Sequence, residues 1–111
     1  MPPPITAANA SPLTDGASAV LIMSEEKALE LGYTPKSILK SWSYAAVDPF
    51  EDLLLGPTYA TQQVLRETGL NMKDIGVVEF HEAFAGQVLA NLTAMASPTF
   101  ATENFNGGDA I

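Results

Sequence analysis

The feature that most constrains the fold of this chain is a change of side-chain pattern at His81. Residues 75–80 form a short, mostly apolar run, which is typical of a strand covered on both faces. Residues 82–95 carry large apolar side chains at helical spacing with alanines between them, which predicts a helix buried nearly all round. The chain is therefore expected to contain a strand, a tight turn at His81 and a helix whose apolar stripe consists of Phe84, Val88, Leu89, Leu92 and Met95.

Two further strand candidates precede this junction. Residues 17–23 are nearly all apolar and predict a strand. Ser24 follows as the predicted N-cap of a helix that ends at Gly32. Residues 36–46 contain an isoleucine, a tryptophan and a tyrosine that suit a pleated surface, so they predict a second strand.

The remaining segments complete an alternating order of strands and helices. A second helix is expected over residues 58–69, and residues 71–74 form a short turn before the third strand. This order predicts an α/β fold with a mainly parallel sheet and helices on both faces. Three strands leave open sheet edges, so the fold is expected to be incomplete on its own. The leucines at 53–55 would be costly in a free loop and are expected to pack against another element or another chain.

The composition disfavours several classes of function. The chain has 13 acidic and five basic residues and a net charge of −8, which argues against binding to nucleic acid, to a membrane surface or to the polyanionic end of a nucleotide ligand. It contains no cysteine, which excludes disulfides, thiolate metal sites and a cysteine nucleophile, and no metal site is predicted. Polar side chains interrupt the uncharged stretch 83–102, so no membrane insertion is expected. The N-terminal Met-Pro-Pro-Pro sequence resembles neither a signal peptide nor a transit peptide.

Five motifs in a fixed order resemble those of the thiolase family. They are Thr-Ala-Ala-Asn-Ala-Ser at 6–11, Thr-Asp-Gly-Ala-Ser at 14–18, Ser-Glu-Glu-Lys-Ala at 24–28, the turn Gly56-Pro57, and Glu-Phe-His-Glu-Ala-Phe-Ala at 79–85. Five ordered matches at family-like spacing are specific, whereas one alone would be weak. The resemblance implies a partial thiolase fold, in which residues 1–30 end the N-terminal domain and residues 31–111 begin the C-terminal domain.

The resemblance also implies a chemistry. Thiolases cleave 3-ketoacyl-CoA with CoA through an acyl-cysteine intermediate, so CoA and acyl-CoA are substrates and no cofactor is expected. By resemblance, His81 holds a water near the developing oxyanion, and Glu82, Ala83 and Phe84 form a wall of the substrate site. Most thiolases carry Asn in place of His81. The His-Glu-Ala-Phe form resembles the thiolase subunits of the mitochondrial trifunctional enzyme of fatty-acid β-oxidation, which implies a mitochondrial location.

Other parts of the thiolase machinery are absent from this chain. It lacks both catalytic cysteines and the Gly-His-Pro histidine, and Asn-Gly-Gly at 106–108 resembles the strand that directly precedes that histidine. Two hypotheses follow. The chain is part of an acetyl-CoA acyltransferase, inactive alone and completed by a complementary thiolase chain, or it is an inactive, thiolase-derived structural subunit of a larger mitochondrial assembly.

Each motif residue also has a purely structural interpretation. His81 fits a surface or hydrogen-bonded core histidine, and Glu82 fits a helix N-terminus. Phe84 fits a core position, and Gly56-Pro57 fits a turn. These interpretations remain open beside the catalytic one at this stage.

Overall fold

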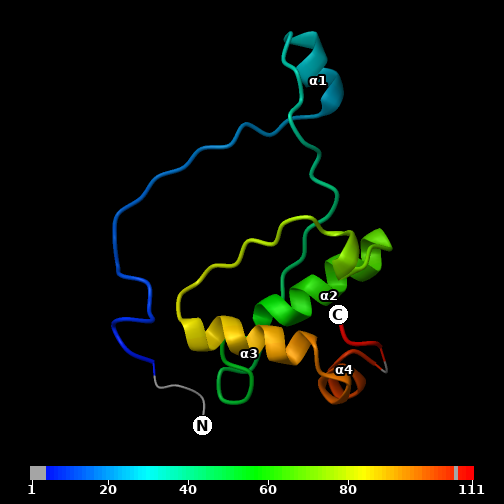
Figure 1. The fold of residues 1–111 in the computed structure, drawn as a ribbon. Coiled ribbons are helices and arrows are strands. Elements are labelled where there is room, and N and C mark those ends of the chain that lie inside the picture. The colour runs from blue at the N-terminus through cyan, green and yellow to red at the C-terminus, as the bar shows by residue number, and fades with distance from the viewer. Residues whose placement is uncertain (1–4, 107) are drawn as a thin grey trace.

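A computed structural model describes residues 5–106 and 108–111, which form four α-helices, one 3₁₀ helix and long irregular connections (Figure 1). The elements in order are α1 (Glu25–Glu30), α2 (Gly56–Thr68), the 3₁₀ helix η1 (Met72–Asp74), α3 (Ala85–Met95) and α4 (Pro98–Asn104). Residues 1–4 of the predicted N-terminal loop, and Gly107 of the Asn-Gly-Gly sequence, lie outside the described residues.

The ends of α1 and α2 form as their sequences predict. The Ser24 side chain accepts a hydrogen bond from the Lys27 amide at 3.2 Å and so caps α1. Gly69 ends α2 in the left-handed conformation, with φ of +68°, which a residue without Cβ adopts at little cost. Helix α2 begins at Gly56, two residues before the predicted start, because Pro57 has a fixed φ that suits the first turn.

The helix after His81 begins later than predicted, and one further helix was not predicted. Residues 82–84 stay outside α3, because Phe84 is extended and forms an isolated antiparallel bridge with Ala10. Beyond α3, Ser97 caps α4 by accepting from the Phe100 amide at 3.2 Å, and Pro98 takes its first position.

The core lies where α3 packs against α2 and α4. Its buried apolar residues are Leu65, Ala94, Met95, Ala101 and Phe105. The rings of Tyr59, Phe100 and Phe105 meet in tilted and edge-to-face pairs with centroids 5.6–6.0 Å apart. This is the geometry that aromatic quadrupoles favour, so the three rings join α2 to α4.

A buried polar network fixes α2 to α3. Asn91 and Thr58 are both fully buried. The Asn91 Oδ1 accepts from the Thr58 amide at 3.1 Å and from the Thr58 hydroxyl at 2.9 Å, while its Nδ2 donates to the carbonyls of Leu54 at 2.8 Å and Gln87 at 2.9 Å. All hydrogen-bonding groups of the Asn91 amide are thus used, which lets a polar side chain sit inside the helical core.

The three predicted strands are not formed within the described residues. Segments 17–23, 36–46 and 75–80 contain no strand, and their backbone groups enter no ladder. Their apolar side chains are correspondingly exposed, among them Ile22, Trp42 and Val77 at 73%, 65% and 77%. The radius of gyration is 17.3 Å, whereas a compact domain of this length would have about 13 Å. A strand, unlike a helix, needs a neighbour for its hydrogen bonds, and these segments find none here.

The predicted burial of other leucines is also incomplete. Leu89 and Leu92 on α3 are 52% and 47% exposed, so α3 is covered on one side and not all round. Leu53 and Leu54 are exposed as well, so they do not pack against another element of this chain, and packing against another chain stays a prediction. No helix in the described part of the chain is long and apolar enough to cross a membrane.

Candidate active-site turn

The turn at His81 is held by a segment that lies some 70 residues earlier in the sequence. Ser11 donates from its amide to the Ala83 carbonyl at 2.9 Å and from its hydroxyl to the Glu82 carbonyl at 2.5 Å. The Ala85 amide donates to the Asn9 carbonyl at 2.9 Å. Two of the five sequence motifs are thus brought into direct contact, and the contact lies immediately after His81.

The earlier segment is itself shaped by a local turn. The Thr6 amide donates to the Asn9 Oδ1 at 2.7 Å, and the Asn9 amide donates to the Thr6 carbonyl at 3.1 Å. Side chains of this type often replace a backbone turn in this way. The turn presents residues 9–11 as a short extended edge for residues 83–85.

The predicted site residues differ in exposure. His81 and Glu82 are exposed, and Ala83 and Phe84 are half-buried. Helix α3 begins three residues after Glu82, at Ala85, and Phe84 is its N-cap. The turn therefore presents an imidazole and a carboxylate to solvent close to the positive end of an 11-residue helix.

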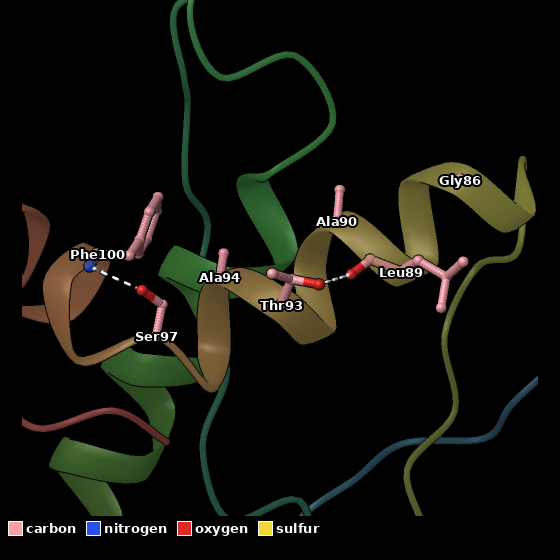
Figure 2. Close-up of a pocket in the computed structure, with 7 residues that line it drawn as sticks. All are labelled: Gly86, Leu89, Ala90, Thr93, Ala94, Ser97 and Phe100. Carbon is pink, nitrogen blue, oxygen red and sulfur yellow. Dashed lines mark hydrogen bonds between the residues drawn. The ribbon is translucent and has the colours of Figure 1, made fainter. Parts of the chain in front are cut away.

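An apolar hollow lies farther along α3, and His81 does not line it (Figure 2). Its volume is about 440 Å³, and its lining residues are Gly86, Leu89, Ala90, Thr93, Ala94, Ser97 and Phe100. The Thr93 hydroxyl donates to the Leu89 carbonyl at 2.8 Å, and Ser97 Oγ accepts from the Phe100 amide. Because both hydroxyls already serve the local backbone, the hollow offers mainly apolar contact.

A second, polar cavity of about 530 Å³ lies beside α2, and it too excludes His81. The Tyr59 hydroxyl in its wall donates to the Asp52 carboxylate at 2.7 Å, and Asn104 Oδ1 lies 3.2 Å away. Burial and then the hydrogen bond to Asp52 raise the pKa of Tyr59 to about 12. The neutral phenol is thus stabilised as a structural donor. No group of three or more His, Asp or Glu side chains within the described residues could hold a metal ion.

Two contacts of this region were not predicted from the sequence. The first is the pairing of residues 9–11 with 83–85, whose motifs were recognised separately but not as neighbours. The second is the buried pair Thr58–Asn91. An asparagine within the expected apolar helix was the available signal for it, since a buried amide requires partners.

Comparison with known proteins confirms the resemblance seen in the motifs. Residues 33–111 match the family model "Thiolase, C-terminal domain". The mitochondrial trifunctional enzyme subunits beta of Bos taurus and Homo sapiens are 63% and 61% identical over 103 residues. These alignments cover 93% of this chain and 22% of each relative. The 3-ketoacyl-CoA thiolase of Shewanella amazonensis is 51% identical over 107 residues, which is 96% of this chain and 24% of that protein.

The chain therefore spans about a quarter or less of the length of the relatives it matches. The two mammalian relatives are named as mitochondrial, and identities of 61–63% to them support the predicted mitochondrial localisation.

Proposed function

The chain belongs to the thiolase family, and we propose that it forms part of a 3-ketoacyl-CoA thiolase of fatty-acid β-oxidation. In this proposal it contributes the His81 turn to an active site that other thiolase elements complete. Residues 1–30 would end the N-terminal domain and residues 31–111 would begin the C-terminal domain. The start of the family match at residue 33 supports that division.

One observation carries the proposal. Three hydrogen bonds between residues 9–11 and 82–85 fix the turn while His81 itself stays exposed. The exposed imidazole is therefore accessible to groups outside this chain, while the turn that carries it is braced near the start of α3. Positioned donors of this kind stabilise a developing oxyanion in thioester chemistry, directly or through a held water.

The remaining roles follow from the same arrangement. We assign His81 to hold a water against the thioester oxygen, and Glu82, Ala83 and Phe84 to the wall of the acyl-CoA site. The covalent step requires a cysteine thiolate, and this chain has no cysteine. We propose that the nucleophile and the acid/base come from other thiolase elements, on a complementary chain or in a larger assembly.

The unpaired segments support such an assembly. Segments 17–23 and 75–80 are apolar and enter no sheet within the described residues. The buried Gln87 Oε1 accepts no hydrogen bond from the described residues either. Neighbouring thiolase strands and donors would satisfy both, and segments 17–23, 36–46 and 75–80 would then form the predicted parallel sheet.

A second candidate function is that of a thiolase-derived structural subunit. It is favoured by the position of His81, which lines neither of the two cavities described above. In that case the chain is retained in a larger mitochondrial assembly for its surface.

Activity measurements separate the two candidates. The purified 111-residue chain is expected to show no CoA-dependent cleavage of a 3-ketoacyl-CoA. In an active assembly with the cysteine-bearing thiolase elements, His81→Ala should lower kcat by roughly 10²–10³, as expected for the loss of one oxyanion donor. His81→Asn, which restores the residue of most thiolases, should retain most of the activity. Glu103→Ala, at an exposed position of α4, serves as the control. An unchanged kcat in His81→Ala would favour the structural subunit.

A further inference from the structure

We propose that Ser11 is a positioning residue for His81, an inference that rests on the proposed function. Ser11 makes two of the three contacts that brace the turn, and both go to consecutive carbonyls, those of Glu82 and Ala83. The Glu82 carbonyl belongs to the second peptide unit after His81. Fixing it restricts rotation of the backbone that carries the imidazole.

These two carbonyls have no partner within α3. The helix begins at Ala85, and the Phe84 carbonyl accepts from the Val88 amide at 3.2 Å as the first helical bond. The carbonyls of Glu82 and Ala83 precede that bond, so the helix does not orient them. Ser11 therefore provides an orientation that α3 cannot supply.

The surroundings of Ser11 distinguish positioning from packing. Ser11 is exposed, so loss of its hydroxyl creates no cavity in the core. Two backbone hydrogen bonds do not involve the hydroxyl and are expected to persist when it is removed. They run from the Ser11 amide to the Ala83 carbonyl and from the Ala85 amide to the Asn9 carbonyl. A Ser11→Ala chain should thus keep the turn in place but leave the Glu82 peptide freer to rotate.

The test is a double-mutant cycle in the assembled, active enzyme. Ser11→Ala should lower kcat about tenfold with KM unchanged, because a small misplacement of a catalytic group slows the chemical step. Ser11→Thr, which keeps the hydroxyl, should restore kcat. In the His81→Ala background Ser11→Ala should have no further effect, since a positioning residue has nothing left to position. Glu103→Ala, at an exposed position of α4 outside the predicted sheet, is the control.

Several outcomes would overturn the inference. An effect on KM alone would assign Ser11 to direct substrate contact. If Ser11→Ala lowers kcat by the same factor in the His81→Ala background as in the unsubstituted chain, Ser11 acts independently of the imidazole. Failure of the Ser11→Ala chain to assemble on size-exclusion chromatography would assign a structural role. If His81→Ala lowers kcat while Ser11→Ala does not, only this inference fails; if His81→Ala has no effect, the proposed function fails with it.

Discussion

Two regions of this chain behave differently although both are rich in apolar side chains. In the closed region, which consists of α2, α3 and α4, aliphatic and aromatic residues form a core with one satisfied polar network. The open region consists of residues 5–46 and 75–80. In residues 5–46, Ala28 is the sole buried residue of the described part, and large side chains such as Val20 and Ile38 are about four-fifths exposed. Figure 1 shows the contrast as a cluster of helices beside a long open trace.

The difference lies in where each element finds its hydrogen bonds. A helix satisfies its backbone from within, so α2 and α3 need only one apolar face to pack. A strand satisfies its backbone only from a neighbour, so the apolar segments 17–23 and 75–80 gain nothing by ordering alone. We therefore expect the open region, and not the closed region, to depend on other thiolase elements.

Hydrogen exchange is the strongest test of the difference between the open and the closed region. In the isolated chain, amides of residues 17–23 and 75–80 should exchange at nearly unprotected rates, whereas those of α2 and α3 should be protected. On assembly with complementary thiolase elements, the same segments should slow by about 10³-fold as ladder bonds form. Exchange followed by mass spectrometry reports both states. Protection of 75–80 in the isolated chain would show that a sheet forms without partners.

Substitution of the buried pair Thr58 and Asn91 tests how much their hydrogen bonds stabilise the closed region. Asn91→Leu removes the side-chain hydrogen bonds to Thr58 and leaves the Leu54 carbonyl without its partner, whereas the Thr58 amide keeps its bond to the Leu55 carbonyl. The substitution should destabilise the helical region by about 2 kcal/mol. Thr58→Val removes only one hydroxyl and should cost about 1.5 kcal/mol. Denaturant unfolding followed by helical circular dichroism measures both values.

The matched control for this pair lies in the open region. Thr14→Val makes the same change as Thr58→Val at an exposed position and should alter stability by less than about 0.5 kcal/mol. Equal losses at Thr14 and Thr58 would mean that the open region is folded after all.

The sequence predicted the elements whose signals are local. The Ser24 cap and the end of α2 at Gly69 follow from two or three neighbouring residues, and both form as predicted. The start of α3 was placed three residues too early, because the bridge between Ala10 and Phe84 keeps the preceding residues extended. No local pattern reveals a contact across more than 70 residues.

The candidate site shows the same division. The motif at His81 was recognisable from the sequence, and the family match now supports the thiolase resemblance that identified it. The contact that braces this turn was not predicted, because the motif at 6–11 carries no sign of which distant segment it meets. The strands predicted at 36–46 and 75–80 rested on side-chain pattern, which indicates that a segment can pair but not that a partner is present.

The pH dependence of stability offers a third probe, located in the closed region. Because burial and Asp52 raise the pKa of Tyr59 to about 12, the folded chain keeps this proton above pH 10, where the unfolded chain loses it. The stabilisation linked to Tyr59 should thus be complete below about pH 10 and be lost as the pH rises towards 12. Urea unfolding at about pH 9 and about pH 11 gives the free energy of unfolding at each pH. This free energy should fall less between the two pH values in Tyr59→Phe than in the unsubstituted chain. An identical loss in both would rule out this linkage.

The smallest expected effect compares two glycines with nearly the same backbone conformation. Gly69 and Gly32 have φ of +68° and +77°, and a Cβ at either would meet no heavy atom within 4 Å, so Ala adds only backbone strain. Gly69→Ala strains the end of α2, which is packed in the core, and should lower the stability of the helical region by about 1 kcal/mol. Gly32→Ala imposes the same strain just after α1, a six-residue helix outside that core. It should loosen α1 without moving the unfolding midpoint of α2 and α3 in a urea titration. A shift of that midpoint by Gly32→Ala as large as that by Gly69→Ala would show that the two regions unfold together, and the division between an open and a closed region would then have to be abandoned.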